Sequence, residues 1–326
     1  MSIIEVNSLT KGYRVHKKKA GIKGSLSGLI KREYQYVEAV KNVSFQVEEG
    51  EILGIVGQNG AGKTTTMKML SGLLYPDAGE ARILNWIPWE RKKEFLTNIS
   101  FLMGQKGQLL WDIPAMDSFF LYKEIYDLKE ESFRQTIKEL SKMLEVEHLL
   151  SVPVRNLSLG ERMKMEIIAA VLHSPKLLFL DEPTIGLDLT TQKKMRSFLN
   201  IQNHRNGTTM VLTSHYMKDI TSLCSRIIII SQGEIIFDDK IEKIRHMYQA
   251  DRVVNVRFAK MVDEAFLKKY HESIKEKKEL QYTFQVKQED VNEFVREISL
   301  LMPVDFSIGE QPIEDIIEKI YRRDIE

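Results

Sequence analysis

The chain has 326 residues, of which 43% are hydrophobic and 29% are charged, and its formal net charge is +1. These values are typical of a soluble globular protein with one large or two ordinary domains. A net charge this close to zero excludes the strongly basic composition of many nucleic-acid binders, so we expect no nucleic-acid partner. The single cysteine, Cys224, excludes an internal disulfide framework.

No stretch of the sequence is suited to crossing a membrane. The longest apolar run, residues 167–172, has six residues, far fewer than the roughly 18 that a span requires. The first residues, MSIIEVNSLTKGY, lack the basic start and apolar core of a secretory signal. We therefore expect a cytoplasmic protein that reaches the inner face of the cell membrane only through a partner.

The N-terminal part of the chain predicts strands on both sides of a basic insertion. Strands are expected at residues 3–9, 43–47 and 51–56, and a helix from Lys63 to about Leu73. Between the first two strands, residues 15–36 carry many Lys and Arg side chains, and a short helix is expected at 26–32. These charges indicate either a solvated loop or a contact with anionic lipid or a membrane partner.

The middle of the chain predicts a helical insert at about residues 108–165. Leu121, Ile125 and Leu128 recur on one helical face, and Ile137, Leu140 and Leu144 form a second apolar set. Further strands are expected at residues 177–180, 210–213, 227–231 and 234–237. Strands that alternate with helices predict an α/β domain with a mainly parallel sheet, over residues 1–245.

The C-terminal part, residues 246–326, has a different pattern. Strands are expected at residues 253–258, 280–286 and 304–308, and amphipathic helices at residues 262–270, 290–301 and 312–321. This β-α-β-α-β-α order predicts a small α+β accessory domain.

Residues 57–64, GQNGAGKT, match the pattern GxxxxGK[ST] of phosphate-binding loops. Glycines allow successive backbone N–H groups to point at a triphosphate, Lys63 can reach the β- and γ-phosphates, and the Thr64 hydroxyl can bind Mg²⁺. The loop lies between a buried strand and a helix N-terminus, which adds its dipole to the anion site. The sequence therefore predicts ATP and Mg²⁺ as ligands, with contacts from Gly57, Asn59, Gly60, Gly62, Lys63, Thr64 and Thr65.

Two consecutive carboxylates end the apolar segment LLFLDE at residues 177–182. A strand this apolar is buried, so carboxylates at its end are expected to have a chemical task. Asp181 is predicted to hold Mg²⁺ through water. Glu182 is predicted to be the general base that polarises the attacking water.

The order of further motifs resembles that of the ABC ATPase family. LSLGER at residues 157–162 resembles the signature motif LSGGQ, and it precedes the acidic pair by about twenty residues, as in the family. TIGLD at residues 184–188 resembles the D-loop, and TSH at residues 213–215 resembles the switch-histidine motif. Gln105 falls at the place of the Q-loop glutamine, with Gln108 as a nearby competitor, and Tyr13 at the place of the aromatic residue that stacks on adenine.

The resemblance covers about residues 3–240 and implies a fold and further roles. The fold implied is a P-loop NTPase (RecA-like) ABC ATPase core with a helical subdomain, to which the C-terminal α+β domain is added. His215 and Gln105 join Glu182 as catalytic residues, and Gln105 joins Thr64 and Asp181 as a metal ligand. Further nucleotide contacts are implied for Tyr13, Ser158, Gly160, Asp181 and Asp188.

The signature segment departs from the family pattern at two positions. Leu159 replaces a glycine and Glu161 replaces a glutamine, whereas Ser158 and Gly160 are retained. Ser158 and Gly160 are the positions that offer a hydroxyl and a backbone N–H to the γ-phosphate. We expect a competent site in which the charge of Glu161 lowers the affinity for the polyphosphate.

In the family, the signature motif of one chain closes over the ATP held by the phosphate loop of another. The resemblance therefore implies a dimer, with this chain or with a paralogous ATPase, and an integral-membrane permease as a further partner. The segment 108–116, with Leu109, Trp111 and Met116, is either part of the permease contact or part of the helical-subdomain core.

The segment GQKGQLLWDIP, the LSLGER signature and the insertion before Val43 resemble a bacterial subgroup of exporters with separately encoded six-helix permeases. The function predicted is that of an ATP-hydrolysing subunit that drives export. An importer ATPase and a non-transport ABC ATPase are the alternatives. Only about 93 residues separate Thr64 from Leu157, too few for the long coiled coil of chromosome-maintenance ABC ATPases.

Overall fold

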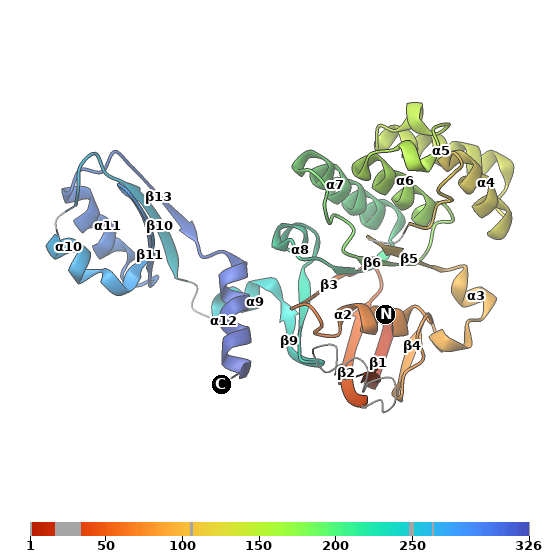
Figure 1. Ribbon diagram of the computed structural model, residues 1–326, viewed down its shortest axis with the longest axis horizontal. Coiled ribbons are helices and arrows are strands. Elements are labelled where there is room, and N and C mark those ends of the chain that lie inside the picture. Colours follow the sequence, from red (N-terminus) through yellow and green to blue (C-terminus); the bar gives the residue numbers. More distant parts are fainter. Residues whose placement is uncertain (1, 17–33, 105–106, 248–250, 263, 326) are drawn as a thin grey trace, which may run out of the picture. The chain divides into compact units, whose positions relative to one another are not determined.

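A computed structural model of the chain describes residues 2–16, 34–104, 107–247, 251–262 and 264–325 (Figure 1). The chain separates into two compact units, Met1–Asp239 and Lys240–Glu326. Among the helices of these described residues, none combines the length and the apolar composition needed to cross a membrane.

A six-stranded sheet forms the centre of the first unit, in the order β5-β6-β7-β3-β8-β9. Its strands are β3 (Ile52–Gly57), β5 (Ile99–Met103), β6 (Leu177–Asp181), β7 (Thr209–Thr213), β8 (Arg226–Ser231) and β9 (Glu234–Lys240). The pairs from β5 to β8 are parallel. The carboxyl ends of β3, β6 and β7 therefore meet at one edge of the sheet, which is where open α/β sheets bind ligands.

The central strands are apolar because helices cover both faces of the sheet. Every residue of β7 and all but the last residue of β3 and of β6 are buried, as expected for parallel strands enclosed between two layers. The predicted strands at 51–56, 177–180 and 210–213 thus coincide with observed ones. The strand β5 was not predicted, since its residues ISFLM are too few to show a period.

A second, antiparallel sheet of three strands has the order β2-β1-β4. Its strands are β1 (Ser2–His16), β2 (Tyr34–Glu48) and β4 (Ala78–Ile83). β1 and β2 extend well beyond the predicted 3–9 and 43–47, because they continue as a paired ribbon from Ser2↔Glu48 to His16↔Tyr34. The ribbon includes both ends of the basic insertion, and the helix predicted at 26–32 lies outside the described residues.

Three helices of the first unit, α4, α5 and α6, lie together (Figure 1), and α6 also packs against β5. The α-helices are α2 (Lys63–Leu70), α3 (Lys93–Leu96), α4 (Ala115–Ile125), α5 (Glu130–Met143), α6 (Leu159–Val171), α7 (Leu189–Asn206) and α8 (Met217–Leu223). Short 3-10 turns are η1 (Pro88–Glu90), η2 (Glu147–Leu149) and η3 (Val154–Asn156). The predicted apolar set Ile137, Leu140 and Leu144 is buried. In contrast, Leu121 and Ile125 on α4 are 48% and 55% exposed.

The second unit begins with a helix, continues in the order β-α-β-β-α-β and ends with another helix. Its elements are α9 (Ile241–Met247), β10 (Arg252–Arg257), α10 (Glu264–Lys269), η4 (His271–Ser273), β11 (Ile274–Lys278), β12 (Gln281–Val286), α11 (Val291–Leu300), β13 (Asp305–Glu310) and α12 (Ile313–Ile325). The antiparallel sheet has the order β11-β12-β10-β13, which is a split β-α-β, or ferredoxin-like, arrangement. The predicted β-α-β-α-β-α order was wrong in omitting β11, because its sequence IKEKK is nearly all charged.

One face of this second sheet carries the apolar core of the unit. The side chains of Val254, Val256 and Phe284 pack with Phe294 and Ile298 of α11. In Figure 1, α10 and α11 lie along the same face of the sheet.

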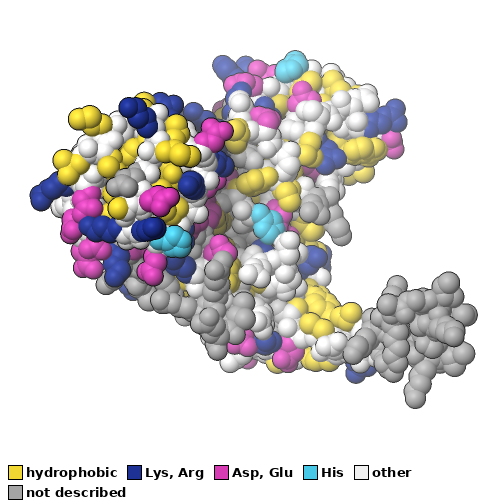
Figure 2. Space-filling view, turned by 60° about the vertical axis from the view of Figure 1, so that its left-hand side comes forward, with side chains coloured by type: hydrophobic (Ala, Val, Ile, Leu, Met, Phe, Trp, Pro, Cys, Tyr) yellow, Lys and Arg dark blue, Asp and Glu magenta, His cyan; other side chains and the backbone are white. Residues whose placement is uncertain are grey.

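Over the face of the molecule drawn in Figure 2, basic side chains lie among acidic ones, as a net charge of +1 would suggest.

Phe284 and Phe306 offer a matched pair of substitutions in this unit. Phe284 is fully buried on β12, whereas Phe306 on the edge strand β13 is 39% exposed. We expect Phe284→Ala to destabilise the unit by about 3–5 kcal/mol, since it leaves a cavity, and Phe306→Ala to cost less than half as much. Hydrogen–deuterium exchange of the β10 and β12 amides in the full chain measures the difference. Equal exchange rates in the two variants would contradict this account of the core.

Candidate active site

The loop between β3 and α2 is shaped by glycines in conformations that other residues rarely adopt. Gly60 and Gly62 have φ values of 81° and 111°, and a Cβ atom on Gly62 would lie 2.3 Å from the carbonyl oxygen of Ala39. α2 begins at Lys63 directly after this loop. A glycine-rich loop that leads directly into a helix N-terminus is a general arrangement for binding phosphate.

The ammonium group of Lys63 lies across this loop. Its Nζ donates to the carbonyl oxygens of Gly57 and Gln58 at 2.7 and 3.1 Å. Burial lowers the pKa of Lys63, and the nearby carboxylates of Glu182 and Asp181 oppose that shift. Lys63 is thus a buried cation within the phosphate loop.

Asp181, at the end of β6, joins the phosphate loop to two strands. Its Oδ1 and Oδ2 atoms accept from the Thr64 hydroxyl at 3.1 and 3.0 Å, and Oδ1 also accepts from the Thr213 hydroxyl at 2.7 Å. A hydroxyl and a carboxylate side by side are oxygen ligands of the kind that Mg²⁺ prefers.

The donor set fits a magnesium ion that is completed by substrate and water. Within the described residues, no three His, Cys, Asp or Glu side chains gather as a metal site. Mg²⁺ is commonly held by one or two protein groups together with phosphate oxygens, and Thr64 with Asp181 matches that case. The predicted third ligand, Gln105, lies outside the described residues.

Glu182 and His215 are in direct contact at the same edge of the sheet. Glu182 Oε1 lies 2.7 Å from His215 Nε2. Glu182 has a φ of 56°, and its N–H donates to the carbonyl and hydroxyl oxygens of Thr213, both at 3.1 Å. A non-glycine residue in this region is strained, and such strain is common at functional sites. The predicted base and switch histidine are thus neighbours.

The signature segment forms the beginning of α6. Ser158 is the N-cap, and Glu161 completes a capping box with it. Glu161 Oε2 accepts from the backbone N–H and the hydroxyl of Ser158 at 2.9 and 2.8 Å, and these bonds lower the pKa of Glu161. The departure from glutamine therefore preserves the cap, which either residue type can complete.

Other predicted contacts lie outside the phosphate loop. Asp188 caps α7 by accepting from the N–H groups of Thr190 and Thr191, and Tyr13 lies on β1 with 39% exposure. In the described part of the chain, no hydrogen bond joins Ser158 or Gly160 to the phosphate loop. The structure thus brings together Lys63, Thr64, Asp181, Glu182 and His215, and places Asn59 and Thr65 beside them in the loop and on α2.

A buried carboxylate that the sequence analysis missed fixes the segment after Gln105. Glu166 of α6 is 2% exposed and accepts from the N–H groups of Gln108 and Leu109 at 2.8 and 3.4 Å. Burial raises the pKa of Glu166. An isolated Glu within an apolar helical run was the only sequence signal for it. Within the predicted segment 108–116, Leu109 is buried as part of the core, whereas Trp111 is 52% exposed.

A groove of about 490 Å³ lies on the first unit, between segments distant in the sequence. Its apolar lining includes Leu73, Leu96, Phe101 and Ile125, and Arg91 and Lys93 add positive charge. The sequence analysis placed a possible permease contact at residues 108–116, and Gln108 of that segment lines this groove. The other walls come from the ends of α2, α3, β5 and α4, which no local sequence pattern connects.

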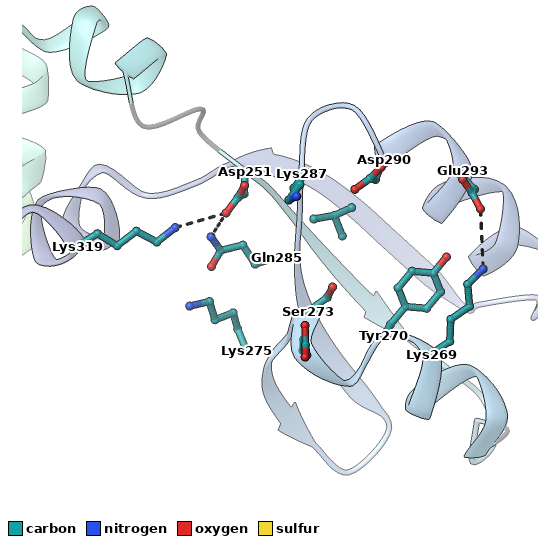
Figure 3. Close-up of a pocket in the computed structure, with 12 residues that line it drawn as sticks. Asp251, Lys269, Tyr270, Ser273, Lys275, Gln285, Lys287, Asp290, Glu293 and Lys319 are labelled. Carbon is teal, nitrogen blue, oxygen red and sulfur yellow. Dashed lines mark hydrogen bonds and ion pairs between the residues drawn. The ribbon is translucent and has the colours of Figure 1, made fainter. Parts of the chain in front are cut away.

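The second unit carries a polar pocket of about 540 Å³, drawn in Figure 3. Lys319 and Gln285 both reach toward Asp251 there, and Lys269 faces Glu293. Its charges are thus partly balanced by one another. None of the predicted site residues lies in it.

The fold and this edge of the sheet together define a P-loop nucleoside-triphosphate hydrolase. The family model described as ABC transporter matches residues 40–185. The ABC transporter ATP-binding protein NatA of Bacillus subtilis is 32% identical, over 68% of this chain and 89% of that protein. The linearmycin resistance ATP-binding protein LnrL of the same species is 29% identical, over 73% and 76%.

Solved structures agree with this assignment. A dimeric post-hydrolysis state of the ATP-binding cassette MJ0796, bound to ADP and Pi, superposes with a TM-score of 0.61 at 26% identity, over 73% of this chain and 98% of that one. The chain belongs to the ABC transporter family, as an ATP-binding subunit whose hydrolysis of ATP is coupled to transport. The predicted fold class and enzymatic activity are confirmed.

His173, beside the groove, generates a prediction about pH. Its ring stacks on Tyr126 with centroids 3.8 Å apart, its Nε2 lies 3.1 Å from the Ile99 carbonyl oxygen, and its buried Nδ1 has no partner among the described residues. Burial lowers the pKa of His173. The unfolded chain therefore binds a proton at this histidine near pH 6.5, whereas the folded chain binds it only at lower pH. This difference favours unfolding below about pH 6.5.

His173→Phe keeps a flat ring against Tyr126 and removes the titrating group. As pH falls from about 8 to about 5, we expect the wild-type free energy of unfolding to decrease relative to that of the variant below about pH 6.5, by at most about 1.4 kcal/mol per pH unit. Urea unfolding followed by tryptophan fluorescence measures both proteins. A difference that does not change with pH would contradict the buried, neutral state of His173.

Proposed function

We propose that this chain drives export through a membrane permease, as one half of an ATP-dependent dimer on the inner face of the cell membrane. The observation that carries the catalytic part is the Glu182–His215 contact of 2.7 Å beside Lys63 and the Thr64–Asp181 pair. Export is supported by the relative named for linearmycin resistance, since resistance by transport requires removal of the compound from the cell.

The dimer is proposed because half of the expected γ-phosphate contacts lie away from the phosphate loop of their own chain. Ser158 and Gly160 stand at the exposed start of α6. In a two-fold dimer, each chain would offer these two residues to the ATP on its mate, giving two equivalent composite sites. Asp188, at the start of α7, would lie near the same interface. The dimeric relative MJ0796 supports this arrangement.

In each site, the residues of the chain would divide the work of hydrolysis. Glu182 would accept a proton from the attacking water, and Lys63 would neutralise charge on the β- and γ-phosphates. The His215 imidazole, now against Glu182, would turn its Nε2 toward the γ-phosphate and Tyr13 would stack on adenine. Thr64 and Asp181, with Gln105, would hold Mg²⁺, which supplies charge neutralisation between the two phosphates.

Glu182→Gln tests this division most simply. The amide retains the shape of the carboxylate but cannot accept the proton, so we expect turnover to fall by about 10²- to 10⁴-fold. ATP should still bind, and the variant should therefore elute as a dimer on size exclusion with ATP and as a monomer without it. The surface substitution Glu49→Gln serves as the control. Wild-type turnover in Glu182→Gln would show that another group is the base.

The groove beside α4 is proposed as the docking site of the permease. It combines exposed apolar side chains, such as Ile125 and Leu73 at 55% and 50%, with the cations Arg91 and Lys93. Exposed apolar patches of this kind mark interaction sites. A short amphipathic cytoplasmic helix with acidic residues would match both its apolar lining and its charge.

Ile125→Glu tests the groove without touching the ATP site. We expect the variant to keep its ATPase activity as an isolated chain and to lose most of its co-purification with integral-membrane proteins from detergent-solubilised membranes. Met261→Glu, at a position that is 90% exposed, is the matched control. Undiminished recovery of the membrane partner with Ile125→Glu would exclude the groove as the docking site.

A further inference from the structure

Asp219 is a fully buried carboxylate with three donors. It lies on α8 with no exposed surface. Arg196 Nη1 donates to its Oδ1 at 2.6 Å, and the Ser214 hydroxyl donates to its Oδ2 at 2.9 Å. The Thr184 hydroxyl also donates to Oδ2. A carboxylate in such a place is tolerated only when it is paired and hydrogen-bonded.

The donors come from segments that carry the hydrolytic residues. Thr184 follows Glu182 by two residues in the loop after β6, and Ser214 directly precedes His215 in the loop after β7. Arg196 belongs to α7, the helix that Asp188 caps. One carboxylate thus joins both loops to each other and to α7.

We propose that Asp219 is a positioning residue for ATP hydrolysis. It holds the two loops that carry Glu182 and His215 in fixed positions relative to each other. This inference rests on the proposed roles of those two residues. Their contact of 2.7 Å spans the two loops, and Thr213 anchors only the backbone of Glu182. Without Asp219, the loop hydroxyls of Thr184 and Ser214 lose their common acceptor. A misplacement of about 1 Å at a reacting group can cost about 10²-fold in rate.

A purely structural role for the buried Arg196–Asp219 pair predicts a different behaviour. Buried ion pairs can often be replaced by apolar residues of similar volume without loss of stability. A structural pair would therefore be dispensable for catalysis once the core is repacked. A positioning carboxylate would not be dispensable, because apolar side chains cannot accept hydrogen bonds from Thr184 and Ser214.

Thr184→Val and Ser214→Ala, singly and together, remove the loop donors while leaving the buried ion pair intact. We expect each variant to lower kcat for ATP hydrolysis by about tenfold, and the double variant by more, with KM and the affinity for a non-hydrolysable ATP analogue nearly unchanged. Thr208→Val is the control, because this threonine is equally buried but donates to the carbonyl of Pro175. Wild-type kcat in the double variant would overturn the proposal.

Arg196→Met combined with Asp219→Leu tests the carboxylate itself. We expect the protein to remain folded with a lower melting temperature, because the buried hydroxyls of Thr184 and Ser214 lose an acceptor, and its kcat to fall by at least about tenfold, again without a matching change in KM. A stable protein with wild-type kcat would overturn the proposal. If these two substitutions prevent folding, the Thr184 and Ser214 variants decide the question. An active Glu182→Gln chain would instead contradict the roles proposed for the site, so the two failures are distinguishable.

Discussion

The carboxylate of Asp181 is the group on which the geometry of the ATP site depends. It accepts hydroxyl hydrogen bonds from Thr64 on α2 and from Thr213 at the end of β7. The phosphate loop, the acidic strand and the strand before the switch histidine are thus tied to one side chain. The same strand end leads into Glu182, whose strained φ of 56° aims its carboxylate at His215. A change at Asp181 would therefore disturb Thr64, Glu182 and His215 together.

Burial explains why polar groups converge at this edge. The parallel strands β3, β6 and β7 are enclosed on both faces, so a polar side chain on them is tolerated only where the strand ends. Beneath the site, Asp219 satisfies the hydroxyls of Thr184 and Ser214 and the guanidinium of Arg196. Glu166 does the same for the N–H groups of Gln108 and Leu109. Each buried carboxylate thus fixes a loop next to the catalytic edge.

The phosphate loop and the buried strands could be predicted from the sequence because their signals are local. Glycine spacing defines the loop at residues 57–64, and apolar runs define β3 and β6. Asp219, Glu166 and most of the groove lining were missed because their roles depend on contacts between segments far apart in the chain, and only Gln108 of the groove lies in the segment singled out for a permease contact. β11 was missed because its charged residues lie at a sheet edge, where lysine is common. The replacement at Glu161 gained a structural explanation, since that carboxylate caps α6 together with Ser158.

The second unit shows the same limit of sequence patterns. Alternation located β10, β12 and β13, and the core of Val254, Val256 and Phe284 follows from it. The hairpin between β11 and β12, and with it the ferredoxin-like order, depends on a pairing that composition does not reveal.

The most direct test of the account is a structure of the chain bound to Mg²⁺ and a non-hydrolysable ATP analogue. The account predicts a two-fold dimer in which the γ-phosphate contacts Lys63 of one chain and Ser158 and Gly160 of the other. Glu182 would then face a water molecule in line with the γ-phosphate. A complex in which one chain alone supplies all the contacts to the γ-phosphate would contradict it.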